Sequence, residues 1–281
     1  MIVMKSALPL VSVVITTKNE EKHIVSCLKS IKNQDYPREK IEIIVVDNHS
    51  TDDTVKLAKQ YTKNIFTKGP ERSAQRNYGM ITKSHGQYVM YVDADMELSK
   101  KVISSCVSRV TKNPDIIGLY IREIVTGDSY WSKVRRFERS FYEGTVIDCV
   151  RFIKKSAFVK VKGFDEQLTG PEDWDLDKKI RQLGKVGLIK QPIYHNEAEF
   201  NLKKYLAKKS YYSKSFDKYI KKWGKDDPDV KKQFSPYYRF FLVFVEDGKW
   251  KKLIDELQIT IGVFVLRFLV GSTYLLRKLI V

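Results

Sequence analysis

Residues 88–98 read YVMYVDADMEL, a run of apolar, β-favouring residues that ends in two aspartates one residue apart, Asp93 and Asp95. The run predicts a buried strand that stops there, because aspartate is a poor strand former and is costly to bury without a partner. The two carboxylates allow two interpretations. In the first, the carboxylates belong to an ordinary turn at the strand end, with Ser99 capping the next helix. In the second, they are hard oxygen ligands for a divalent metal that binds a phosphate.

Apolar runs of the same kind occur upstream, and helical patterns separate them. The predicted strands cover residues 10–15, 41–46 and 87–92, and the predicted helices cover residues 20–34, 52–61 and 71–84. This alternation predicts an α/β fold with a mixed, mainly parallel sheet and helices on both faces. Ligands bind beyond the carboxyl ends of such strands. Polar residues gather at those ends as TTKNEE (16–21), DNHSTDD (47–53) and DAD (93–95).

The composition describes a globular protein with an anionic partner. Of 281 residues, 43% are hydrophobic and 30% are charged, and the formal net charge is +17. An excess of this size favours a phosphorylated substrate, an acidic lipid or a nucleic acid as partner. A protein that only binds nucleic acid would not collect acids at successive strand ends, because they repel phosphate unless a metal intervenes.

The segment after the second strand has a structural interpretation for most of its residues. Ser50 is predicted to cap the next helix, with Asp53 three positions on in the manner of a capping box. Asp47 is left over, because it directly ends an all-apolar strand. A carboxylate at that position can accept a hydrogen bond from the edge of a nucleobase.

Two later segments also allow a structural and a functional interpretation. Arg72, Arg76 and Asn77 share one helix face, which is either solvated or places a guanidinium on a diphosphate or on nearby carboxylates. GPEDWDL, residues 170–176, predicts a helix start with Pro171 at the first position and acids in the first turn. Trp174 and Leu176 would then be packing residues.

These motifs, in this order, resemble the family 2 glycosyltransferases of the GT-A fold over about residues 8–225. The resemblance rests on TTKNEE, on VVDNHSTDDT (45–54), RSAQRNYG (72–79), YVDADM (91–96) and GPEDWDL, and on His195 after a later strand. It implies an enzyme that moves a sugar from a nucleoside-diphosphate sugar, with UDP favoured over GDP and with Mn²⁺ or Mg²⁺ as cofactor.

The resemblance also implies roles for individual residues. Asp47 would read the base, Asp93 would lie near the ribose and donor sugar, and Asp95 would ligate the metal, with His195 as a further ligand. Asp173 would be the general base that an attacking hydroxyl needs, supported by Glu172. The remaining nucleotide and donor contacts would come from Thr16, Asn19, Glu20, Arg72, Arg76, Asn77 and Ala94. One departure is Lys18, where the family often has an aromatic residue or proline, so the stacking of the base stays open.

The chain changes character after this core, and we expect a catalytic domain over residues 1–225 and a helical tail over 226–281. Residues 200–225 predict one basic amphipathic helix. Residues 257–276 are about 30 Å long as a helix, near the thickness of a bilayer core, yet contain Arg267, which costs roughly 2.5–3.5 kcal/mol to insert. A polar stripe favours a helix lying in the membrane interface over one that spans the membrane or packs on the domain or another subunit. That stripe holds Thr260, Arg267, Gly271, Tyr274 and Lys278.

The sequence thus predicts an inverting glycosyltransferase held on the cytoplasmic side of the cell membrane, as a peripheral or monotopic protein. The expected partners are an anionic membrane surface and a polyprenyl-phosphate or lipid-linked glycan acceptor, with oligomers possible through the tail and no nucleic acid. The alternatives are a soluble polysaccharide acceptor and a sugar-nucleotide nucleotidyltransferase. The latter would need a glycine-rich loop where TTKNEE stands, and an NAD-type oxidoreductase would need G-x-G-x-x-G there.

Overall fold

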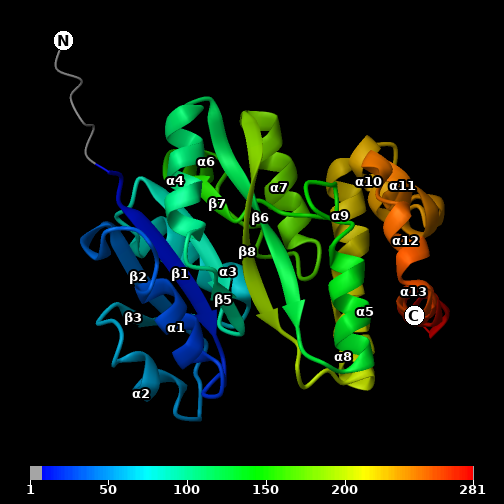
Figure 1. Cartoon of the computed structure of the whole chain (residues 1–281), viewed down its shortest axis with the longest axis horizontal. Coiled ribbons are helices and arrows are strands. Elements are labelled where there is room, and N and C mark those ends of the chain that lie inside the picture. The colour runs from blue at the N-terminus through cyan, green and yellow to red at the C-terminus, as the bar shows by residue number, and fades with distance from the viewer. Residues whose placement is uncertain (1–7, 281) are drawn as a thin grey trace. The chain divides into compact units, whose positions relative to one another are not determined.

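The computed structural model describes residues 8–280, and strands and helices alternate through its first half (Figure 1). The strands are β1 (Val11–Thr17), β2 (Ile41–Asp47), β3 (Ile65–Thr67), β4 (Tyr88–Asp93), β5 (Met96–Leu98), β6 (Ile116–Thr126), β7 (Phe152–Lys154) and β8 (Lys185–Asn196). The helices are α1 (Ile24–Lys32), α2 (Thr54–Ala58), α3 (Arg72–Asn77), α4 (Val102–Lys112), α5 (Tyr130–Arg139), α6 (Lys155–Lys160), α7 (Glu172–Leu183), α8 (Leu202–Tyr212), α9 (Phe216–Trp223), α10 (Pro228–Phe234), α11 (Val243–Val245), α12 (Lys251–Asp255) and α13 (Leu257–Ile280).

The described strands form one eight-stranded sheet in the order β3-β2-β1-β4-β7-β6-β8-β5. The three predicted strands are present as β1, β2 and β4, and they pair in parallel through β1. β7 runs antiparallel to β4 and to β6. The predicted mixed, mainly parallel sheet is therefore confirmed.

The chain divides into two compact units. The first comprises residues up to 121, 150–164 and 179–193, and the second comprises 122–149, 165–178 and 194–281. The chain passes between them within β6, α7 and β8, and also between residues 149 and 150 and between 164 and 165. This division differs from the predicted domain boundary at residue 225, which stays a prediction.

In the first unit, helices cover both faces of the sheet. Side chains at alternate positions of β1, β2 and β4 pack against α1 and α4 in one apolar cluster, and Figure 1 shows these two helices over the same face. On the opposite face α3 continues into a π-helical segment, Tyr78–Lys83. Gly79 lies so close to the sheet there that an added Cβ would come within 2.4 Å of Val14. A larger residue at this position would push the segment off the sheet.

The second unit has an apolar core of its own, made by helices. Val134 and Phe141, from α5 and the turn after it, pack with Phe244 and with Val263 and Leu266 of α13. A neighbouring cluster surrounds Trp174 of α7, whose ring lies 5.9–6.2 Å from those of Phe216, Tyr219 and Phe234. The prediction that Trp174 and Leu176 are packing residues is confirmed, since Leu176 is fully buried.

Several local predictions were wrong. Ser50 does not cap α2: its hydroxyl donates to Asp47, and Asp52 instead accepts from the Thr54 N–H at 3.1 Å. Ser99 does not cap α4 through its side chain, since Lys101 is the capping residue and makes no side-chain bond. The predicted helix over residues 200–225 is two helices, α8 and α9, separated by a 3₁₀ turn over Ser213–Ser215. Tyr219 of α9 is buried in the protein, so this face does not meet lipid.

The polar stripe of α13 also faces the other way from the prediction. Thr260 and Arg267 are buried inside the second unit, and the Tyr274 ring packs 5.7 Å from that of Phe216. The exposed face is apolar and includes Ile261, Val265 and Phe268. A helix lying in a membrane interface would turn its polar stripe to water. In this protein Thr260, Arg267 and Tyr274 make internal contacts, whereas Gly271 faces open space and the side chain of Lys278 lies outside the described residues.

Candidate functional site

The register of the parallel strands lines up the predicted polar residues at one edge of the sheet. Thr16 lies opposite Asp93 on β4, and Thr17 lies opposite Asp47 on β2. Asp47 in turn lies opposite Thr67 on β3. Neighbouring strands are about 4.8 Å apart, so Asp47 and Asp93 end strands on either side of β1. This edge is where ligands bind in sheets of this type.

Asp93 is held by a buried arginine. Nη2 of Arg76 lies 2.7 Å from Oδ1 of Asp93, and the Arg76 side chain is 1% exposed. Burial by itself would raise the pKa of Asp93, but the charges of Arg76, Arg151 and Arg72 hold that pKa well below its usual range. Asp93 is therefore a carboxylate at neutral pH. The Thr16 hydroxyl donates to the same oxygen at 3.4 Å.

The aromatic surroundings of Arg76 explain how its charge is buried. The guanidinium lies 4.4 Å from the ring centre of Tyr91 and 5.1 Å from that of Phe164. Arg151 lies over the same Tyr91 ring at 5.2 Å. Such cation–π contacts stabilise a cation more strongly once it is removed from water. The interpretation of the α3 arginines as a solvated helix face is wrong for Arg76, which lies on a carboxylate.

The loops after β1 and β2 are joined by Ser50. Asp47 accepts from the Ser50 N–H at 2.8 Å and from its hydroxyl at 2.5 Å, while the Ser50 oxygen accepts from the Asn19 N–H at 2.8 Å. Asn19 has a φ of 54°, a left-handed conformation that asparagine tolerates. Its side-chain oxygen accepts from the Thr51 N–H at 2.9 Å. The next N–H, of Glu20, donates to the Thr54 hydroxyl at 2.7 Å.

The other predicted residues of the first unit differ in their surroundings. Asn77 does not extend the arginine face: its amide bonds both the N–H and the C=O of Phe164, at 2.8 and 2.9 Å. Arg72 is half-buried and acts on Asp93 through its charge. Ala94 is buried, and Asp95 is half-buried one residue further on. Arg76 pairs with Asp93, and the assignment of Asp95 as a metal ligand stays a prediction.

The acidic pair of GPEDWDL begins α7 in the second unit. Glu172, the first residue of the helix, is fully buried, and its carboxylate accepts from the Gly170 N–H. Asp173 is half-buried, and its carbonyl accepts from the Cys149 thiol at 3.1 Å. A carboxylate in the first turn is stabilised by the helix dipole. The pair therefore separates into a buried acid that fixes the turn and a more accessible one.

His195, near the end of β8, is oriented by an acid. Its Nδ1 lies 2.9 Å from Oε1 of Glu123 and 3.9 Å from Oε1 of Glu197. The other Glu123 oxygen accepts from Arg139 at 2.7 Å. A histidine held through one nitrogen by a carboxylate has the arrangement that metal-binding histidines commonly show. Within residues 8–280, no group of three or more His, Cys, Asp and Glu side chains is placed to hold a metal by itself.

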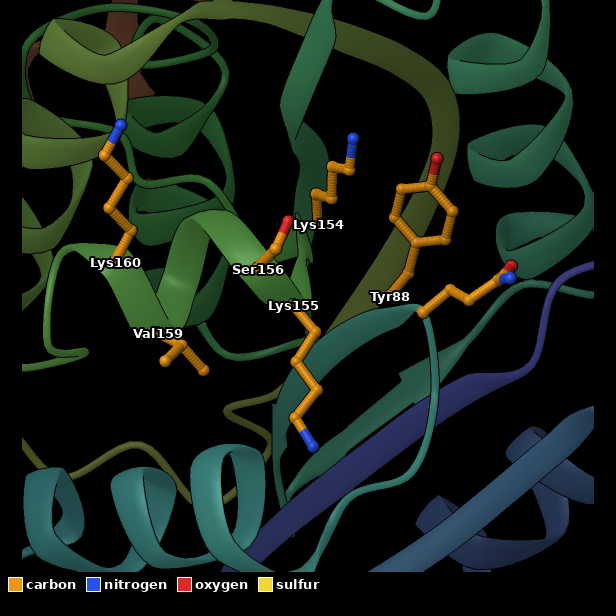
Figure 2. Close-up of a pocket in the computed structure, with 7 residues that line it drawn as sticks. Tyr88, Lys154, Lys155, Ser156, Val159 and Lys160 are labelled. Atoms are coloured by element: carbon orange, nitrogen blue, oxygen red, sulfur yellow. The ribbon is translucent and has the colours of Figure 1, made fainter.

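A cavity of about 680 Å³ lies away from these residues. It is lined by Gln87, Tyr88, Lys154, Lys155, Ser156, Val159 and Lys160. Tyr88 begins β4, whereas Asp93 ends it, so the cavity is at the opposite end of that strand. Figure 2 shows that the ammonium groups of Lys154, Lys155 and Lys160 point in different directions. They do not converge on one position as a phosphate site requires.

The comparison with known families agrees with this geometry. The model for "Glycosyl transferase family 2" matches residues 12–162. The chain belongs to glycosyltransferase family 2. The matched residues include every predicted site residue of the first unit, from Thr16 to Asp95, and end before α7 and His195. The family inferred from the motifs is therefore confirmed.

The curated relatives are similar over parts of their length. Glycosyltransferase AglE of Haloferax volcanii is 33% identical over 123 residues, which are 41% of this chain and 40% of AglE. Minor teichoic acid biosynthesis protein GgaB of Bacillus subtilis is 24% identical over 275 residues, which are 89% of this chain and 30% of GgaB. The chain thus spans less than half the length of these relatives.

Solved structures show the same fold. The mannosyltransferase PcManGT of Pyrobaculum calidifontis, in complex with GDP-Man and Mn²⁺, matches with a TM-score of 0.65 and 18% identity, over 97% of this chain and 89% of that one. Staphylococcus aureus TarS matches with a TM-score of 0.57 and 17% identity, over 87% of this chain and 45% of that one. The expected GT-A fold is confirmed.

Several residues that shape the site were not predicted from the sequence. Arg151 acts on Asp93 but lies 58 positions away along the chain, with no motif around it. Gln75 donates to the Thr17 and Val46 carbonyls at 3.1 and 2.7 Å and so joins the ends of β1 and β2. Glu123 had no signal of its own. For Gln75 the sequence offered one signal, its position between Arg72 and Arg76 in a segment already predicted to belong to the site.

Proposed function

We propose that this protein is an inverting, divalent-metal-dependent glycosyltransferase that moves a sugar from a nucleoside-diphosphate sugar to a membrane-linked acceptor. The observation that supports the proposal is the register at the carboxyl edge of the sheet, where Asp93 lies opposite Thr16 and Asp47 lies opposite Thr17, in a chain of this family. UDP is the favoured nucleotide and GDP the alternative. The base meets Asp47, and the ribose and sugar meet Asp93.

The chemistry of the donor set fits a hard divalent cation. Mn²⁺ and Mg²⁺ prefer oxygen ligands, and Mg²⁺ is usually held by one or two carboxylates together with substrate phosphates. Asp95 supplies such a carboxylate, and Asp95 and His195 are the proposed ligands. When bound, the metal offsets the negative charge that grows on the leaving diphosphate. Arg72 and Asn77 remain proposed donor-binding residues, together with Asn19, Glu20 and Ala94.

The reacting groups of the protein are the acids of α7. Asp173 accepts the proton of the acceptor hydroxyl as the oxygen forms its bond to the anomeric carbon. The bond from that carbon to the diphosphate oxygen breaks, and its electron pair leaves with the nucleotide. Glu172 keeps the first turn of α7 in place, because its buried carboxylate binds the Gly170 N–H. With a polyprenyl phosphate as acceptor, the attacking oxygen is already an anion, and Asp173 positions it.

The exposed face of α13 supports a membrane-linked acceptor. Leu257, Ile261, Val265, Phe268 and Leu275 are all exposed and recur every three or four residues, or seven, so they form one stripe. Exposed apolar patches of this kind mark interaction sites. Among the described residues, α13 is the one helix long and apolar enough to cross a membrane, a test that core helices also pass.

The geometry of α13 favours lying on the membrane over crossing it. Its other face is buried against α5 and holds the charged Arg267, so lipid does not surround it. The exposed lysines Lys251 and Lys252 attract anionic headgroups, whereas the exposed acids Asp255 and Glu256 oppose them. Apolar contact is therefore the main attraction. We propose a peripheral enzyme on the cytoplasmic face of the membrane.

Donor turnover tests the proposal. The purified protein is incubated with UDP-sugars or GDP-sugars, with and without Mn²⁺, and with vesicles that contain polyprenyl phosphate. We expect metal-dependent release of the nucleoside diphosphate and a glycosylated lipid of inverted anomeric configuration. Transfer to a soluble polysaccharide but not to lipid would contradict the lipid-linked acceptor and make the polysaccharide the acceptor. Release of pyrophosphate from a sugar phosphate and a nucleoside triphosphate would show a nucleotidyltransferase in place of a glycosyltransferase.

A further inference from the structure

A buried row of alternating charges runs through the second unit from α13 to His195. Arg267 of α13 lies 3.1 Å from Glu138 of α5, and the other Glu138 oxygen lies 2.7 Å from Arg135. Arg135 in turn lies 3.3 Å from Glu197, and Glu197 lies 3.9 Å from Nδ1 of His195. We call these five residues the α13–His195 network.

The α13–His195 network is most deeply buried around Arg267 of α13. The Arg267 side chain is 4% exposed, that of Glu138 is 6% exposed, and the guanidinium lies 4.2 Å from the ring centre of Phe244. Arg267 also donates to the Tyr142 hydroxyl at 2.7 Å, and that hydroxyl donates to Glu138 at 2.6 Å. Each buried charge needs its neighbour, because an unpaired charge in the interior costs several kcal/mol.

The network is therefore sensitive to the position of α13. A shift of the helix moves Arg267, and Glu138 must then rely more on Arg135, which also holds Glu197. Both Arg135 contacts to Glu197 are 3.3 Å long, and Glu197 faces the same His195 nitrogen that Glu123 binds at 2.9 Å. A change at Arg135 thus alters the negative charge that Glu197 places 3.9 Å from the imidazole, while Glu123 still binds the same nitrogen. The hydrogen bonds from Arg267 to Glu197 polarise one another, and the last step, from Glu197 to His195 at 3.9 Å, is an electrostatic one.

We propose that Arg267 is a positioning residue for His195, and that seating the exposed α13 face on an anionic lipid surface fixes the network and so strengthens metal binding. This inference rests on the proposed function in one respect, the assignment of His195 as a metal ligand. It adds a regulatory role for the tail: the enzyme binds its metal best where its lipid-linked acceptor is present.

Direct metal binding tests the inference without measuring activity. Mn²⁺ is titrated into the full-length protein with UDP or GDP, in buffer and with phosphatidylglycerol vesicles, and free Mn²⁺ is followed by electron paramagnetic resonance. Arg267→Met removes the charge, Arg267→Lys restores it, and Arg136→Met is the matched control. Arg136 is on the same helix as Glu138 but donates to the carbonyls of Val125 and Gly127. Glu197→Gln interrupts the network at a more exposed position, in case Arg267→Met does not fold.

The expected results follow from the effect of outer contacts on metal ligands, which is commonly 10–100-fold. Vesicles should tighten Mn²⁺ binding of the unmodified protein, and Arg267→Met and Glu197→Gln should each weaken it about tenfold and abolish the vesicle effect. Arg267→Lys should recover most of the loss, and Arg136→Met should leave Mn²⁺ affinity unchanged. If folded Arg267→Met and folded Glu197→Gln both bind Mn²⁺ as tightly as the unmodified protein does, the inference is overturned and the proposed function stands. No Mn²⁺ binding by the unmodified protein overturns the proposed function together with it.

Discussion

The Arg76 guanidinium donates to Asp93 Oδ1 at 2.7 Å from a position with almost no contact with water. Removing one partner of a buried pair typically costs about 3–5 kcal/mol, and the cost here lies near the lower end because Asp93 is 26% exposed and also faces Arg151 and Arg72. We therefore expect Arg76→Met to lower the free energy of unfolding by about that amount in urea titrations. Arg38→Met, at an exposed arginine, should change it by less than about 0.5 kcal/mol. Equal small effects of the two substitutions would contradict the arrangement.

The depressed pKa values of Asp93 and Glu138 predict acid sensitivity. Burial would raise the pKa of Glu138, but Arg135 and Arg267 hold it well below its usual range. Carboxylates with lowered pKa values bind fewer protons when folded than when unfolded, so their stabilisation is present above about pH 4 and is lost as the pH falls further. The urea midpoint should therefore fall as the pH drops below about 4 and should keep falling as the pH is lowered further. Glu138→Gln should be less stable at pH 7 and should show a shallower drop; an unchanged slope would be evidence against this pairing.

Asp173→Asn tests the base assignment. The variant should lose transfer to a sugar hydroxyl by at least 100-fold, as expected for general base catalysis, and should retain nucleotide binding. Asp217→Asn is the control, since Asp217 is also an acid in the first turn of a helix but is exposed to solvent. Both rates are measured as nucleoside diphosphate released in the presence of acceptor. Unchanged turnover by Asp173→Asn would assign the base elsewhere.

The outer face of α13 is tested by vesicle flotation. Ile261 and Phe268 are 63% and 68% exposed, so Ile261→Ser with Phe268→Ser should weaken flotation with phosphatidylglycerol vesicles while leaving the melting temperature nearly unchanged. Leu266→Ser, on the buried face, should instead destabilise the fold by about 2–5 kcal/mol. Deletion of residues 235–281 is a poor test, because it removes Val263 and Leu266 from the core. Undiminished flotation of the double variant would exclude this face as the membrane contact.

The strands and their polar ends were predictable from the sequence because both depend on local chemistry. A short apolar run such as that of β1 is typical of a strand buried on both faces, and aspartate at the ends of its neighbours marks where those strands end. The parallel register then aligns Asp47 and Asp93 without further information. The partners of these residues were less predictable, because Arg76 and Arg151 reach Asp93 through the tertiary fold.

The errors have a common physical cause. A capping pattern at Ser50 and an amphipathic pattern over residues 200–225 describe local preferences, and tertiary contacts override both. Asp47 takes the Ser50 hydroxyl, and the turn at Ser213–Ser215 lets α8 and α9 pack separately. For α13 the predicted helical period was right, but a hydropathy pattern does not show which side of a helix packs against the protein. The buried partners of Arg267 determine that side, and they lie on α5 and in the turn after it.

Metal-dependent nucleotide binding at Asp95 tests the central claim most directly. Melting temperatures are measured for the unmodified protein, for Asp95→Ala and for Glu97→Ala, a control at an exposed acid, with UDP or GDP and with or without Mn²⁺. A ligand that binds only the folded state raises the melting temperature. We predict that Mn²⁺ and nucleotide together raise the melting temperature of the unmodified protein and of Glu97→Ala but not that of Asp95→Ala, whose ligand-free melting temperature should stay the same. An Asp95→Ala variant that melts earlier without ligand but keeps the full Mn²⁺-dependent increment would contradict the claim and make Asp95 a turn residue.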